Sequence, residues 1–254
     1  MRLLHRLDSF MTSPVAQHVG RAWGGMMNLL VPNPCALCVW SDAEKYHLCR
    51  VCTALLRDQT RQVIQAQDFA DALPLDIVTG QPLPVFAASL YTPEMARLVL
   101  NFKDHQRIKL AQVFRPIMYR TLQYATQDCG SPSYRVVPIP TSGAGMRKRG
   151  YNPVTMMLPS PLPDRLHCDP GLLKTRWNFF SRTAHHGSGV QARRESARRK
   201  FRLARRHQEP AEPIILVDDV LTTGATLAGA ARTLQAAGFD IAAAVVLSTV
   251  IPRS

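Results

Sequence analysis

The chain has 254 residues, of which 46% are hydrophobic, and this allows one sizeable α/β core together with a small additional module. Its formal net charge of +13 favours partners that carry negative charge. Residues 1–30 mix apolar side chains with charged ones, which argues against an export signal or a transmembrane segment there. We therefore expect a cytoplasmic protein whose residues 1–30 form an amphipathic helical segment.

Four cysteines follow this segment in two pairs, Cys35 with Cys38 and Cys49 with Cys52. Each C-x2-C pair can turn two thiolates toward one ion, and four thiolates suit a closed tetrahedral Zn²⁺ site. Such an ion would be structural, because no ligand position remains for water. Disulfides are the alternative, but without an export signal a reducing compartment is the expected setting. The sequence thus predicts a small zinc-ribbon module over residues 31–60.

Apolar strands and helices alternate from about residue 85 onward, a pattern that indicates a parallel sheet flanked by helices. The first expected elements are a strand at Ala87–Tyr91, helices at Pro93–Phe102 and Lys109–Tyr124, and a strand at Tyr134–Pro140. The first helix should turn Met95, Leu98, Val99 and Phe102 inward. Pro116 makes the middle of the second helix uncertain.

A glycine- and hydroxyl-containing loop is expected at Thr141–Gly145, directly after the strand. Three cations, Arg147, Lys148 and Arg149, follow it. A flexible turn with cations at the end of a strand predicts an anion site.

A second group of cations lies further along the chain. Its members are Arg193, Arg194, Arg198, Arg199, Lys200, Arg202, Arg205 and Arg206. Such a cluster attracts nucleic-acid phosphates through counterion release, so we expect contact with single-stranded DNA. The alternative is a solvated helical face, which gains weight because Glu195 interrupts the run.

The most informative segment begins with the apolar strand Ile214–Val217. Two carboxylates, Asp218 and Asp219, follow the strand, and a loop then leads into a helix at Leu227–Ala237 and a strand at Ile241–Leu247. Backbone N–H groups at a helix N-terminus bind phosphate, and carboxylates beside them bind hydroxyl groups or a metal ion. The segment therefore predicts a site for a 5-phosphorylated sugar, with Gly224 allowing close approach of the phosphate. The alternative is a solvated strand end followed by an ordinary helix cap.

This segment resembles the 5-phosphoribosyl-1-pyrophosphate (PRPP) motif of type I phosphoribosyltransferases. The resemblance implies that Asp218 and Asp219 face the ribose hydroxyls. It also implies that the 5-phosphate is wrapped by Leu221, Thr222, Thr223, Gly224, Ala225 and Thr226. Mg²⁺ would accompany PRPP if the protein is a transferase. The resemblance also implies that the pyrophosphate lies at the anion site of Arg147, Lys148 and Arg149. The phosphoribosyltransferase-like domain would cover residues 85–254.

The order of motifs along the chain closely resembles the ComF family of competence and DNA-utilisation proteins. The motifs are the two cysteine pairs, Leu100–Asp104, Val137–Pro140, Arg149–Asn152, the arginine-rich stretch and the PRPP segment. The resemblance implies an accessory protein for DNA uptake that contacts single-stranded DNA or a DNA translocase. Three positions depart from the family pattern, because Pro153, His186 and Ser196 stand where that pattern has amides.

Two further interpretations remain open. One is an active phosphoribosyltransferase that uses PRPP and Mg²⁺ on an unidentified acceptor. The other is a zinc-ribbon transcription regulator, which would leave the long α/β body unexplained.

Overall fold

The protein is described by a computed structural model that covers residues 34–75, 79–104, 107–176, 201–204 and 212–252. Contacts along the chain divide it into two compact units, Met1–Cys52 and Thr53–Ser254, which we call unit 1 and unit 2. The expected helical segment over residues 1–30 lies outside the described residues.

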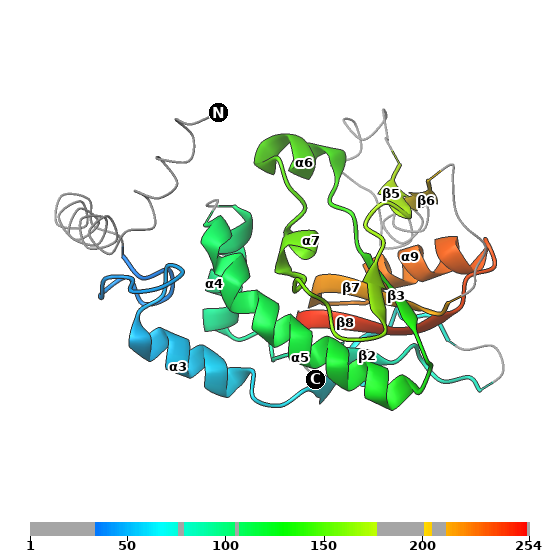
Figure 1. Ribbon diagram of the computed structural model, residues 1–254, viewed down its shortest axis with the longest axis horizontal. Coiled ribbons are helices and arrows are strands. Elements are labelled where there is room, and N and C mark those ends of the chain that lie inside the picture. Colours follow the sequence, from blue (N-terminus) through cyan, green and yellow to red (C-terminus); the bar gives the residue numbers. More distant parts are fainter. Residues whose placement is uncertain (1–33, 76–78, 105–106, 177–200, 205–211, 253–254) are drawn as a thin grey trace, which may run out of the picture. The chain divides into compact units, whose positions relative to one another are not determined.

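Unit 2 is built on a six-stranded sheet with the order β1-β2-β8-β7-β3-β4 (Figure 1). Its strands are β1 (Ile64–Gln65), β2 (Val85–Ala87), β3 (Tyr134–Pro138), β4 (Leu166–Cys168), β7 (Ile214–Leu221) and β8 (Ile241–Thr249). Neighbours from β2 to β4 pair in parallel, and only β1 is antiparallel to its neighbour. The predicted α/β architecture with a mostly parallel sheet is therefore confirmed.

The helices of the described chain are mostly connections between these strands. They are α3 (Arg50–Gln59), α4 (Pro93–Lys103), α5 (Ala111–Cys129), α6 (Gly143–Arg149), α7 (Pro153–Met157) and α9 (Ala225–Gln235), with short 3-10 turns at Gln67–Phe69 and Ile108–Leu110. A separate antiparallel ribbon joins β5 (Leu173–Thr175) to β6 (Phe201–Leu203).

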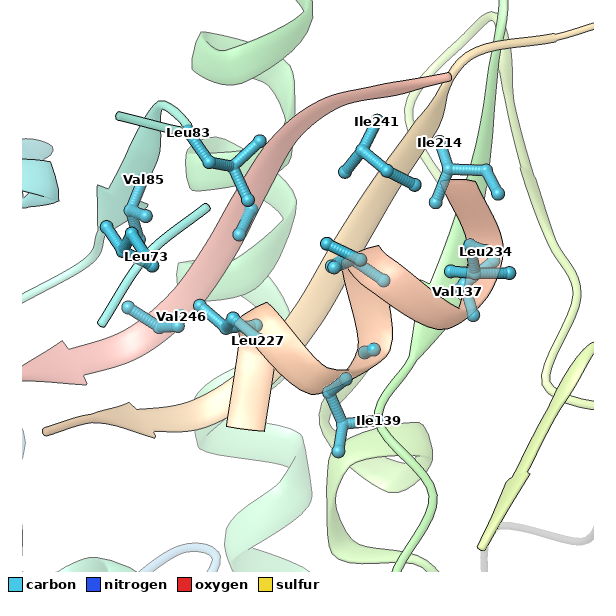
Figure 2. Close-up of a cluster of buried hydrophobic side chains, with 14 of the residues drawn as sticks. Leu73, Leu83, Val85, Val137, Ile139, Ile214, Leu227, Leu234, Ile241 and Val246 are labelled. Atoms are coloured by element: carbon cyan, nitrogen blue, oxygen red, sulfur yellow. The ribbon is translucent and has the colours of Figure 1, made fainter. Parts of the chain in front are cut away.

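The helices α5 and α9 cover opposite faces of the sheet. Phe86 of β2 packs its ring against Tyr124 of α5, whereas its neighbours Val85 and Ala87 belong to the core beside α9. Successive strand residues point to opposite faces, so α5 and α9 cannot share one. Figure 2 shows the α9 side, where Leu227 and Leu234 contact apolar side chains of the strands.

Helix α4 forms as its sequence predicts. Thr92 caps its first turn by accepting a hydrogen bond from the Met95 backbone N–H at 3.2 Å, and Pro93 occupies the first helical position. The residues that it buries are Met95, Leu98, Val99 and Phe102, as expected.

Other boundaries differ from the sequence prediction. The first strand lies at Val85–Ala87 rather than Ala87–Tyr91, and β3 ends at Pro138. The expected loop Thr141–Gly145 is partly helical, because Ser142 caps α6 by accepting from the Gly145 N–H at 3.1 Å. Strand β7 continues through both acids to Leu221, since its pairing with β8 extends to Thr249.

The segment before residue 85 also belongs to the α/β body. It supplies β1 and the buried core residues Ala66, Ala70, Leu73 and Leu83. Unit 1 ends at Cys52, within α3, rather than near residue 60. The body therefore begins earlier than the alternation of apolar segments indicates.

Candidate functional site

The four predicted metal ligands lie together in unit 1. The sulfurs of Cys35, Cys38, Cys49 and Cys52 are all within 4.8 Å of one another, and the Cys38 and Cys49 Sγ atoms are 3.8 Å apart. None of these four cysteines forms a disulfide bond. The backbone N–H groups of Leu37 and Cys49 donate to the Cys35 Sγ at 3.5 and 3.3 Å. This set can hold one metal ion, and it is the one such group found among the described residues.

The thiols of Cys38 and Cys52 have pKa values that are shifted in opposite directions. A backbone hydrogen bond from Ser41 lowers the pKa of Cys38 to about 6, so this sulfur is a thiolate at neutral pH. Burial, together with the neighbouring sulfurs, raises the pKa of Cys52. Four adjacent thiols cannot all ionise without a compensating charge, and a bound cation would supply that charge.

The two acids of the PRPP-like segment lie on β7, where the strand approaches the carboxyl edge of the sheet. Asp218 is in register with Val246, which faces the α9 core, so the Asp218 side chain points to that face of the sheet. The Asp219 side chain points to the opposite face and forms an ion pair with Lys103. The Asp218 Oδ1 accepts a hydrogen bond from the Asp219 backbone N–H at 2.9 Å. The adjacent acids therefore have different partners.

Residues Thr222–Gly224 form the short loop between β7 and α9. Gly224 adopts a left-handed conformation with φ of 78°. A Cβ atom at this position would lie 2.9 Å from the Leu73 Cδ2 and 3.2 Å from the Ala70 Cβ. Glycine is thus required by backbone conformation and by close packing against Leu73, and not only by the approach of a ligand. Gly224 is the N-cap residue of α9 and has no side chain to cap it, while the Thr223 Oγ1 accepts a hydrogen bond from the Ala225 N–H at 3.4 Å.

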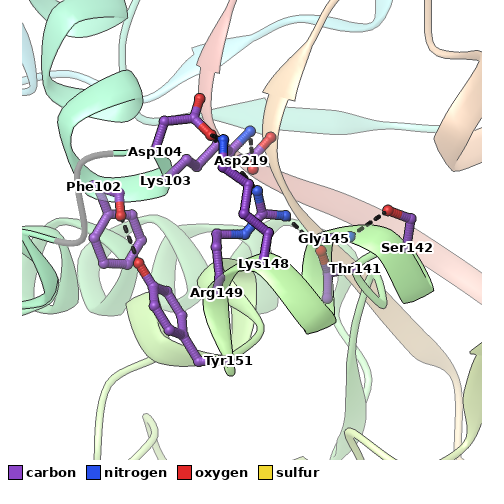
Figure 3. A network of polar contacts seen from close by, with 10 residues as sticks. All are labelled: Phe102, Lys103, Asp104, Thr141, Ser142, Gly145, Lys148, Arg149, Tyr151 and Asp219. Atoms are coloured by element: carbon purple, nitrogen blue, oxygen red, sulfur yellow. Dashed lines mark hydrogen bonds and ion pairs between the residues drawn. The ribbon is translucent and has the colours of Figure 1, made fainter.

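Lys103 and Asp104, at the end of α4, join the acids to the basic helix α6 (Figure 3). Lys103 pairs with Asp219, while Asp104 Oδ1 lies 2.9 Å from the Lys148 Nζ and 3.9 Å from an Arg149 nitrogen. The sequence places both residues in the motif Leu100–Asp104 but indicates no partner for either of them. Their signal is an adjacent cation and anion directly after a buried helix, but their partners are distant in the chain.

The cations of α6 occupy the last turn of a seven-residue helix rather than an open loop. The Arg149 Nη2 donates to the Thr141 Oγ1 at 2.8 Å, and its buried Nε has no hydrogen-bond partner among the described residues. A Cβ on Gly145 would approach this Thr141 oxygen to 2.7 Å. Because Gly145 has no side chain, the Arg149 guanidinium fits beside it and reaches the Thr141 hydroxyl.

The Arg-Gly-Tyr-Asn motif shapes the connection after α6. Gly150 ends the helix in a left-handed conformation, and the Tyr151 hydroxyl donates to the Phe102 carbonyl at 2.7 Å. Asn152 donates to the Ile139 carbonyl at 3.1 Å and caps α7 through the Val154 N–H. Pro153, one of the three departures from the family pattern, takes the first position of α7, which suits proline.

Most of the arginine-rich stretch lies outside the described residues, as do His186 and Ser196. Arg202 is described, and it is exposed on β6 in register with Lys174 of β5. Within the described part of the chain, neither cation has an ion-pair partner. This ribbon borders a cleft of about 590 Å³ that also contacts Thr141 and Tyr151.

The acids do not fit a Mg²⁺ ion shared between them. Magnesium requires oxygen ligands that converge in octahedral geometry. Asp218 and Asp219 leave opposite faces of the strand, and the Asp219 carboxylate already contacts an ammonium group. The cation at this acid is supplied by the chain itself.

Comparison with models of known protein families and with curated proteins gives no significant match for this chain. Within the described residues, no helix is both long enough and apolar enough to span a membrane.

Proposed function

We propose that unit 2 binds PRPP or a related phosphosugar at the junction of β7 and α9. The observation that carries this proposal is the succession of an acidic strand end, a short hydroxyl-rich loop and the start of α9 in a parallel sheet. In such sheets, ligands bind at the carboxyl ends of the strands, and helix N-terminal N–H groups receive phosphate. The 5-phosphate would lie on residues 222–226, and the ribose hydroxyls would reach the acids.

The metal of unit 1 is proposed to be Zn²⁺ in a structural role. With Zn–S bonds of about 2.3 Å, a tetrahedron separates its sulfurs by about 3.8 Å. The Cys38–Cys49 separation of 3.8 Å agrees with this value. Four sulfurs complete the coordination, which leaves no position for a reacting water.

At the level of the whole chain, we propose a ComF-like accessory protein for DNA uptake or utilisation. Support comes from the order of motifs and from the net charge of +13. Single-stranded DNA is the proposed partner of the basic ribbon, and a DNA translocase is the proposed protein partner. The exposed cations Lys174 and Arg202 suit backbone phosphates, which bind without regard to base sequence.

Calorimetric titration with PRPP tests the phosphosugar proposal. We expect saturable binding by the natural sequence, and a loss of at least about tenfold in affinity when Asp218→Asn and Asp219→Asn are combined, because hydrogen bonds to charged groups are lost. Asp240→Asn is the matched control, since Asp240 precedes β8 at the opposite edge of the sheet. Equal binding by the double variant and the control would contradict the proposed site.

A second candidate function is phosphoribosyl transfer to an acceptor. The observation in its favour is the cleft beside Thr141, at the carboxyl end of the strand next to β7. Its volume of about 590 Å³ lies within the range of small-molecule sites. Release of pyrophosphate from PRPP in the presence of candidate acceptors tests this function. PRPP that binds but is never consumed would favour the accessory role.

A further inference from the structure

The ion pair between Lys103 and Asp219 occupies a largely enclosed position in unit 2. The Lys103 side chain is 26% exposed and the Asp219 side chain 14% exposed. A carboxylate with so little contact with water needs a partner of opposite charge, because desolvation of an isolated ion is costly. Lys103 provides this charge from the last residue of α4.

From this contact we propose that Lys103 takes the place of a divalent cation at the acids. The sugar hydroxyls would then bind Asp219 without Mg²⁺. This inference rests on the proposed phosphosugar function. A carboxylate has two oxygens and about four acceptor positions, so Asp219 can accept hydroxyl hydrogens while it remains paired. Lys103 is thus a positioning residue, since it holds the carboxylate that contacts the sugar.

A metal ion at Asp219 would face an unfavourable environment while Lys103 is present. Two positive charges close together in a partly buried site repel each other more strongly than they do in water. The neighbouring acids offer no replacement. Asp218 points to the other face of β7, and Asp104 is paired with cations of α6. The ammonium group and a divalent ion therefore exclude each other at this carboxylate.

Ribose 5-phosphate is a suitable probe, because it carries the sugar hydroxyls and the 5-phosphate but has no pyrophosphate that would itself bind Mg²⁺. Its affinity would be measured by calorimetry in EDTA and again in millimolar Mg²⁺. The variants are Lys103→Met, which removes the charge, and Lys103→Arg, which keeps it. Lys109→Met is the matched control, since Lys109 is an exposed lysine on the following 3-10 turn. Circular dichroism would verify that each variant is folded.

For the natural sequence, the Lys103→Arg variant and the control, we expect the affinity of each protein to be the same in EDTA and in Mg²⁺. Lys103→Met should lose about tenfold or more in EDTA, and Mg²⁺ should restore part of this loss because it replaces the missing charge. Binding by the natural sequence only when Mg²⁺ is present would overturn the Lys103 proposal and leave the phosphosugar site intact. Absence of binding under every condition would overturn both.

Discussion

Gly224 shows how a single residue in a ligand motif can also serve the fold. The sequence indicates glycine at this point because a phosphate needs close approach to the backbone. The structure adds two requirements that no local pattern contains, a φ of 78° and contact with Leu73 from another part of the chain. Loss of binding after a large substitution at Gly224 would therefore not, by itself, identify a phosphate site.

Gly224→Ala should lower the stability of the protein. We expect a cost of about 1–3 kcal/mol, because a left-handed alanine is strained and its Cβ would crowd Leu73. Thermal unfolding measures this change. Gly80→Ala is the matched control, since Gly80 has φ of 69° but no atom of the described residues within 4 Å of a Cβ built there. Equal losses for the two variants would show that the Leu73 contact contributes nothing.

Elements whose signals are local were predicted best. The capping threonine, the proline and the spacing of apolar residues in α4 lie within one segment, and its buried face was predicted residue by residue. Helix α6 was missed because Gly143 and Gly145 favour a loop, while its cap at Ser142 has its effect only once the helix forms. The length of β7 depends on pairing with β8, which the β7 sequence does not reveal.

Asp104, at the end of α4, pairs with Lys148 and Arg149 of α6, and its removal tests whether this pairing opposes ligand binding. Asp104→Asn should release Lys148 and Arg149, and PRPP affinity should then rise by about threefold to tenfold at low salt, because an opposing charge is removed. The gain should shrink as salt is added. Calorimetry measures the effect, with Asp240→Asn as control. Weaker binding by Asp104→Asn would mean that Asp104 orients the cations for the ligand and does not compete with it.

At the scale of the whole molecule, the cluster of four cysteines was predictable and the ion-pair network was not. The four cysteines lie in two short, regularly spaced pairs, so the spacing alone places them together. Lys103 and Asp219 meet only because α4 and β7 pack within the same unit. Contacts of this kind depend on tertiary structure, and a single sequence contains no local signal for them.

The division into two units predicts that metal loss is a local event. Cys49→Ser should reduce bound zinc below the expected one equivalent per chain and loosen residues 34–52, because three thiolates hold the ion less tightly than four. Hydrogen exchange should show lost protection in unit 1 and unchanged protection in β7 and β8. Cys129→Ser, outside the tetrad, is the control. Full metal content in the Cys49→Ser variant would contradict the assignment.

The phosphosugar site is the central claim, and amide NMR during titration with ribose 5-phosphate tests it most directly. We predict that the largest chemical-shift changes fall on the N–H groups of residues 222–226, with smaller changes at Asp218 and Asp219. Inorganic phosphate should perturb the same loop but leave the acids unaffected, because it lacks the sugar hydroxyls. Shifts confined to other parts of the chain, or none at millimolar ligand, would contradict the account.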